Sequence, residues 1–268
     1  MIRDITIGQY YPADSLIHRL DPRVKLFGTM LFLIAVFSFR GIAGFVWITI
    51  FLAGVIKLSK VPFRYMVKGL KAIWVLMALT AFFNLFMTNS PDVIWQWKWL
   101  HITEEGIETA VRMVIRLIYL ILGTSIMTLT TTPNELTDGL EKSLRPLQAL
   151  HVPVHEIAMM MAIALRFIPI LIEETDKIMR AQMARGADFE SGNLIRKAKA
   201  MIPLLVPLFI SAFRRANDLA MAMEARCYRG GAGRTKMKPL KYAKRDRIGY
   251  LILAAFLATV LLLRRFLP

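Results

Sequence analysis

The sequence predicts an all-α polytopic membrane protein. It has about five transmembrane helices, with long, bent cytoplasmic helices between the fourth and fifth spans. Two observations predict this class. The 268 residues are 56% hydrophobic, with a mean hydropathy of +0.49, whereas soluble domains are about half apolar at most. The formal net charge is also +16. Apolar spans in a bilayer, with basic residues gathered on one side, account for both.

The spans are predicted from apolar runs, because a bilayer core of about 30 Å needs roughly 20 helical residues. The first two runs are short and only Arg40 and Gly41 lie near their junction, so we expect a tight hairpin. A fifth run, 248–263, lies in the final transmembrane helix, 248–268. The four runs of the membrane domain, residues 1–131, are 24–39, 41–56, 69–87 and 110–129.

Three tryptophans alternate with other residues in the loop "TNSPDVIWQWKWL" after the third run. Aromatic residues gather at membrane–water interfaces, although an ordinary outer loop is the simpler interpretation.

The distribution of lysine and arginine predicts the orientation. Four occur in residues 1–25, five in 57–71 and twenty in 132–247, whereas the remaining connections and the chain end carry Arg40, Lys98, Arg264 and Arg265. Because basic residues favour the cytoplasmic side, we expect a cytoplasmic N-terminus. The polar segment before the first run has no small-residue cleavage site after an apolar core, which predicts no cleaved signal peptide.

The cytoplasmic region, 132–247, is strongly apolar and is expected to form three helices at about 133–149, 154–186 and 200–229. Thr132, Pro133 and Glu135 form a capping-box pattern at the start of the first helix. The other two helices begin like membrane helices and end like soluble ones. Pro169 interrupts one of them, and Pro203 and Pro207 interrupt the other, which predicts bending.

Several kinds of chemistry find no support in the sequence. The glycine cluster at 230–238 lacks the Gly-Lys-Ser/Thr of a phosphate-binding loop. His151 and His155 are spaced like metal ligands, but Pro153 lies between them and a third ligand is missing, so no metal site is predicted. Arg112 and Arg116 share a face of the fourth run, where they can reach the interface or pair with Glu104, Glu105 or Glu108.

Two segments end in similar charged tips. "AQMARGADF" contains Ala184, Arg185 and Gly186, and "AMEARCYRG" contains Ala225, Arg226 and Cys227. Each arginine could simply favour the negative end of a helix dipole. Two such tips on apolar cytoplasmic helices instead indicate a pair of docking points, because a guanidinium binds several carboxylate oxygens at once.

The chain resembles the transmembrane T component of energy-coupling factor transporters, a branch of the ABC systems. The resemblance rests on the start "YYPADSLIHRLDPRVKL", on the long cytoplasmic helices and on the paired tips, which resemble the family's Ala-Arg-Gly motifs. It covers essentially the whole chain. Cys227 departs from the motif, and we expect the second helix to run on to Tyr228 and stop at Gly230.

The resemblance implies a non-catalytic subunit of a vitamin or micronutrient importer in a prokaryotic plasma membrane. Its implied partners are two ABC-type ATPases and a small substrate-binding membrane subunit, or several interchangeable ones, with no nucleic acid. ATP and Mg would bind to the ATPases, and no cofactor to this chain. Arg185 and Arg226 would dock the ATPases. The residues expected to contact the substrate-binding subunit are Met159, Met160, Met161, Ile163, Phe167, Leu204 and Leu208.

Other classes of protein are less well supported by the residues. A stand-alone secondary transporter needs polar groups at the bilayer midplane, where the third run offers only Asn84. A membrane assembly scaffold would explain the cytoplasmic helices but not the paired arginine tips. An intramembrane enzyme would need a carboxylate pair, a serine–histidine set or a metal cluster in the spans.

Overall fold

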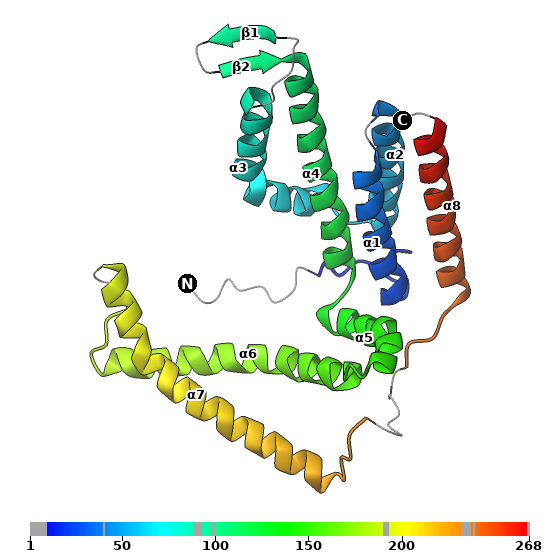
Figure 1. Ribbon diagram of the computed structural model, residues 1–268. Coiled ribbons are helices and arrows are strands. Elements are labelled where there is room, and N and C mark those ends of the chain that lie inside the picture. The colour runs from blue at the N-terminus through cyan, green and yellow to red at the C-terminus, as the bar shows by residue number, and fades with distance from the viewer. Residues whose placement is uncertain are drawn as a thin grey trace. The chain divides into compact units, whose positions relative to one another are not determined.

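The structure is a computed structural model that describes residues 10–39, 41–87, 93–97, 100–189, 193–231, 237 and 239–266. It confirms the all-α membrane class, since the chain is a series of helices (Figure 1) apart from one short hairpin. The chain divides into two compact units, and each is described separately. One comprises residues 8–139 and 240–268, and the other comprises residues 1–7 and 140–239.

The first unit contains the five helices predicted as spans, and each is found close to its expected place. Their bounds are α1 (Pro22–Ser38), α2 (Ile42–Ser59), α3 (Phe63–Met87), α4 (Glu104–Thr130) and α8 (Lys244–Phe266). Helices α1 and α2 have 17 and 18 residues. At a rise of about 1.5 Å per residue they approach the lower limit for crossing a bilayer core.

The loop expected after the third span contains a two-stranded antiparallel hairpin, which the sequence interpretation did not anticipate. Strands β1 (Val93–Trp97) and β2 (Leu100–Thr103) pair with Trp97 opposite Leu100. Two strands bury too little apolar surface to be stable alone. Trp95 and Trp97 of the alternating tryptophans lie in β1, and Trp99 lies outside the described residues.

A buried apolar cluster holds the first unit together. Val36 on α1, Ile48 on α2, Met66 on α3 and Val260 on α8 are each at most 2% exposed. Glycine also permits a close approach of α1 and α4, because a Cβ on Gly123 of α4 would lie 2.5 Å from the Phe32 ring of α1.

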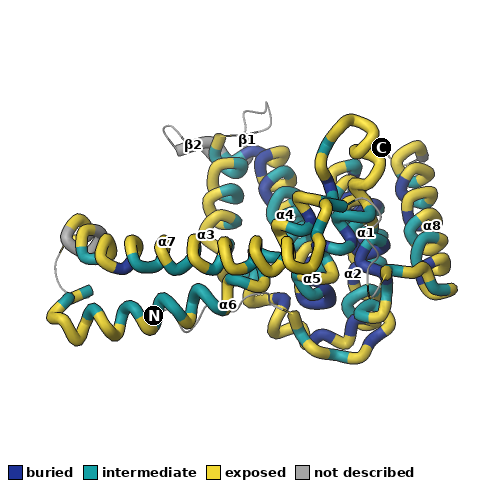
Figure 2. Tube along the Cα trace, turned by 90° about the horizontal axis from the view of Figure 1, so that it is seen from below, coloured by how far each residue is buried: buried dark blue, intermediate teal, exposed yellow. Residues whose placement is uncertain are grey.

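The second unit contains the end of α5 (Pro133–Leu144), a 3₁₀ helix (Arg145–Leu150), α6 (Val154–Ala184) and α7 (Leu194–Ala225). The start of α5 lies in the first unit, where the capping box at Thr132 is confirmed: its backbone N–H donates to Glu135 and its hydroxyl accepts from the Glu135 N–H. Helix α5 ends at Leu144 rather than at the expected position 149, because Pro146 follows. Figure 2 shows long exposed stretches along α6 and α7.

Four helices are long and apolar enough to cross a membrane among the described residues: α3, α4, α6 and α8. A shorter apolar stretch, Ala43–Ser59, lies in α2. Helix α6 thus meets the criterion that the predicted spans α3, α4 and α8 also meet, although the positive charge around it predicts a cytoplasmic place. The cytoplasmic assignment of residues 132–247 stays a prediction.

Candidate functional site: two arginine tips on paired helices

Helix α6 ends in a hydrogen-bonded cap that fixes the position of Arg185. The backbone N–H of Gly186 donates to the Met183 carbonyl and that of Ala187 donates to the Gln182 carbonyl, both at 3.0 Å. This pair of bonds defines a Schellman motif, which needs a left-handed residue directly after the cap. Gly186 supplies it with a φ of 89°. Arg185 is therefore the last residue before the chain reverses.

Helix α7 ends in the same motif. The Cys227 N–H donates to the Glu224 carbonyl at 2.8 Å and the Tyr228 N–H donates to the Met223 carbonyl at 3.0 Å. Cys227 takes the left-handed conformation, with a φ of 56°. The expectation that cysteine would let the helix run on to Tyr228 is wrong, because two satisfied carbonyls compensate for the left-handed strain at Cys227. The helix ends at Ala225, and it begins at Leu194 rather than at position 200.

The two arginines consequently occupy equivalent positions as the cap residues of two long helices. Both side chains are exposed, and neither forms an ion pair with another residue in the described part of the chain. A guanidinium held at a rigid helix end can bind carboxylates on another protein with little loss of its own freedom.

Exposed apolar side chains form a stripe along the first half of α6. Ile157, Met160, Met161 and Ile168 are exposed and recur at the three- and four-residue spacing that defines one helix face. Of the predicted contact residues, Met160 and Met161 lie on this stripe. The others on this helix, Met159, Ile163 and Phe167, are half-buried.

A similar stripe runs along α7 through Ile202, Leu205, Phe209 and Phe213. The two α7 residues predicted to contact a partner are not on it: Leu204 is only 5% exposed and Leu208 is half-buried. Sequence spacing did not reveal this stripe. Every residue between Met201 and Phe213 is apolar except the two prolines and Ser211. The sequence there has no polar face that would mark the exposed side of the helix.

The segment "YYPADSLIHRLDPRVKL", residues 10–26 and called the N-terminal signature below, makes hydrogen bonds within the first unit. His18 Nε2 lies 3.0 Å from the Tyr11 carbonyl and its Nδ1 lies 2.7 Å from the Ser15 hydroxyl. A carbonyl only accepts, so Nε2 carries a proton, and in the neutral imidazole the Ser15 hydroxyl donates to Nδ1. The Tyr11 N–H donates in turn to the Leu129 carbonyl at 2.9 Å. These bonds attach the segment before α1 to the end of α4.

Lys25, in the first turn of α1, is buried and satisfies two main-chain carbonyls. Its ammonium donates to the His18 carbonyl at 3.0 Å and to the Thr130 carbonyl at 2.7 Å. Thr130 is the last residue of α4, where helix carbonyls have no partner within the helix. The lysine of the signature is thus a cap for another helix.

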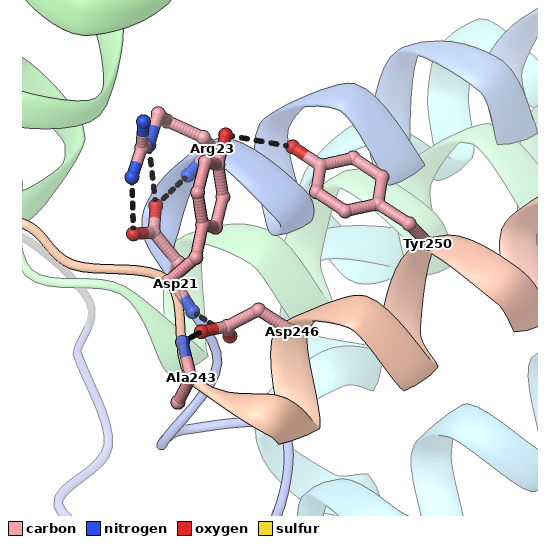
Figure 3. A network of polar contacts seen from close by, with 6 residues as sticks. Asp21, Arg23, Ala243, Asp246 and Tyr250 are labelled. Atoms are coloured by element: carbon pink, nitrogen blue, oxygen red, sulfur yellow. Dashed lines mark hydrogen bonds and ion pairs between the residues drawn. The ribbon is translucent and has the colours of Figure 1, made fainter.

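Asp21 and Asp246 join the beginnings of α1 and α8 (Figure 3). Asp246 is 1% exposed and accepts from the backbone N–H groups of Asp21, at 2.8 Å, and Ala243, at 2.7 Å. Asp21 binds the Arg23 guanidinium through both carboxylate oxygens, at 3.0 and 2.9 Å. That guanidinium lies 3.7 Å from the Tyr242 ring centre. Sequence reasoning missed Asp246, because a lone aspartate carries no sign of a partner near the other end of the chain.

Arg112 has one of the glutamate partners that the sequence predicts, whereas the contact of Arg116 was not predicted. Arg112 pairs with Glu108 at 3.0 Å. Arg116 donates to the Phe39 carbonyl at 3.0 Å, at the end of α1. The second histidine of the pair considered as metal ligands, His155, instead contacts Glu141 at 2.9 Å. The described residues contain no group of three potential metal ligands.

Comparison with known proteins places these features in a family. A family model described as cobalt transport protein (CbiQ) matches residues 13–237. The chain is 57% identical to the energy-coupling factor transporter transmembrane protein EcfT of Clostridium kluyveri, over 94% of this chain and 93% of the relative. It is 52% identical to the EcfT of Ruminiclostridium cellulolyticum, over 98% of both chains.

A third relative of the same name, from Bacillus subtilis, is 48% identical over 96% of this chain and 98% of its own length. The family match spans both tips and most of the N-terminal signature. The chain belongs to the cobalt transport protein family, and within it to the transmembrane proteins EcfT of energy-coupling factor transporters.

Proposed function

We propose that this chain is the coupling subunit of an importer for a vitamin or another micronutrient in a prokaryotic plasma membrane, with its N-terminus in the cytoplasm. It joins two ABC-type ATPase subunits to a small substrate-binding membrane subunit. The ATPases bind ATP and Mg, and this chain binds no cofactor. The matching caps that present Arg185 and Arg226 carry the proposal, because one docking point is available for each of two ATPases.

The physical case for docking rests on how the tips are held. The arginines follow helices of 31 and 32 residues, each of which extends about 45 Å at a rise of about 1.5 Å per residue. A force on the tip therefore displaces a long rigid element. Carboxylates in a groove on each ATPase would bind the guanidinium through short, charge-assisted hydrogen bonds. The flanking residues, Ala184, Gly186, Ala225 and Cys227, are small enough to let the groove close around the arginine.

The exposed apolar stripes of α6 and α7 are the surfaces that would contact the substrate-binding subunit. The stripe with Met161 on α6 and the stripe with Phe209 on α7 each present apolar surface to a membrane partner. Methionine is flexible and polarizable, so one such surface can pack against different partners. Movement of α6 and α7 by the ATPases would then move the substrate-binding subunit.

The test reverses both tip charges. Arg185→Glu combined with Arg226→Glu should cost about 2–5 kcal/mol of binding free energy at each buried contact. ATP-dependent uptake by the reconstituted complex should then fall about 30-fold or more. The matched control reverses two nearby exposed arginines, Arg180 and Arg229, to give the same change in net charge. An assembled, fully active complex of the tip variant would show that docking occurs elsewhere.

A further inference from the structure

An ion pair joins the two long helices away from their tips. Arg215 of α7 donates through Nη2 to Glu174 of α6 at 3.0 Å. The two side chains are 37% and 24% exposed, so both are partly covered by the helices themselves. The adjacent residues of like charge, Glu173 and Arg214, are exposed and form no ion pair within the described residues.

The paired residues hold equivalent positions on the two helices. Glu174 precedes Arg185 by the same number of positions as Arg215 precedes Arg226. Each ion-pair residue is about three helical turns, or roughly 16 Å, along its helix from its own tip. The spacing in sequence between the paired residues therefore equals the spacing between the tips. The ion pair links the two helices at the same distance from both docking points.

A second link lies nearer to the first tip. The Gln182 side-chain amide donates to the Pro203 carbonyl at 3.4 Å. That carbonyl lacks its usual intrahelical partner, because the residue one helical turn later, Pro207, has no N–H. The helix-breaking proline thus frees an acceptor for the neighbouring helix.

Two links at different positions fix an angle that one link would leave free. Helices α6 and α7 cross and then diverge (Figure 1). A single contact at the crossing would allow one helix to rotate against the other. The amide link and the ion pair are about two turns apart on α6 and about three turns apart on α7. Together they resist that rotation.

We infer that the Glu174–Arg215 ion pair is a brace that fixes the angle between α6 and α7 and thereby the distance between Arg185 and Arg226. Both members are positioning residues, since they act through the tips. A partly exposed ion pair adds little to global stability. Its loss should therefore change the geometry of the tips more than the folding of the chain. The role in transport rests on the proposed docking of the ATPases, whereas the geometric role does not.

Distance measurements between the tips test the geometry directly. The sequence has a single cysteine, Cys227, which is exposed at the second tip. Met183→Cys adds a second exposed site beside the first tip. Nitroxide labels on both, in the full chain in nanodiscs, report a distance distribution by double electron–electron resonance. Glu174→Arg or Arg215→Glu should broaden or shift this distribution, because each brings like charges together.

The charge swap separates an ionic brace from simple side-chain packing. Glu174→Arg combined with Arg215→Glu restores an attractive pair and should restore the original distribution. Glu173→Arg and Arg214→Glu change the same charges on exposed neighbours and should leave it unchanged. Unaltered distances in the single variants, or distances that the swap fails to restore, would overturn the inference.

Transport by the unlabelled, reconstituted complex then tests the consequence. Uptake per ATP hydrolysed should fall about fivefold or more in the single variants, because about fivefold is the lower end of typical coupling factors between two sites. It should recover in the charge-swap variant. If single variants with altered tip distances keep normal uptake, the ion pair has no role in coupling and that part of the inference is wrong. The proposed docking of the ATPases is tested separately by the reversal of both tip arginines. If that variant keeps its uptake, the docking proposal is wrong. The distance measurements would still test the brace.

Discussion

Cys227 occupies the same left-handed position in the cap of α7 that Gly186 occupies in the cap of α6. Glycine takes this conformation without steric strain, whereas for a residue with a Cβ it costs about 1–2 kcal/mol. Apart from its two chain neighbours, no atom of the described residues lies within 4 Å of the position that a Cβ on Gly186 would occupy, so the backbone angle and not crowding favours glycine there.

Cys227→Gly should leave ATP-dependent uptake intact and stabilise the cap of α7 by about 1 kcal/mol. Hydrogen exchange at the Cys227 and Tyr228 amides would measure this, because these N–H groups make the cap bonds. The reciprocal change, Gly186→Val, places a β-branched residue at a φ of 89° and should weaken both the cap and transport. Faster amide exchange in Cys227→Gly would contradict the assignment.

Asp246→Ala should destabilise the first unit by about 2–4 kcal/mol, because it leaves the buried N–H groups of Asp21 and Ala243 without an acceptor. Asp246→Asn keeps one acceptor oxygen, so its stability should lie between that of the alanine variant and that of the original protein. Thermal unfolding in detergent measures both. Arg245→Ala, at an exposed neighbouring position, is the control, and an equal effect there would argue against the role of Asp246.

Lys25→Met keeps most of the side-chain volume but removes both hydrogen bonds of the ammonium. The carbonyls of His18 and Thr130 would then lose a charged donor in a buried place. We expect a loss of about 2–3 kcal/mol in the free energy of unfolding, since a hydrogen bond to a charged group contributes about 1.5–3 kcal/mol. Denaturant titration of the purified chain would measure it, and a stability equal to that of the parent chain would show that water replaces the lysine.

Met161→Asp should release the substrate-binding subunit while both ATPases stay attached. An unpaired carboxylate in an apolar interface costs about 3 kcal/mol or more, which corresponds to a loss of affinity of about 100-fold or more. Met161→Leu keeps the surface apolar and is the matched control. Co-purification of the complex is the measurement, and loss of the ATPases with retention of the substrate-binding subunit would assign the stripe to the other partner.

Periodic and strictly local features could be predicted from the sequence. The apolar runs predicted five helices because a spanning helix must be apolar over its whole length. The capping box at Thr132 was predictable because both of its hydrogen bonds join residues three positions apart. The two tips could be recognised as a pair because each motif lies within a few residues.

The sequence by itself determined the membrane class, the order of the helices and the positions of the two arginines. Only the tertiary structure decided that Asp246 binds the Asp21 backbone, that Lys25 caps α4 and that Glu174 meets Arg215. Each of these contacts joins residues at least 41 positions apart. Their partners depend on how helices pack, and a single charged residue in a sequence carries no record of which helix lies beside it.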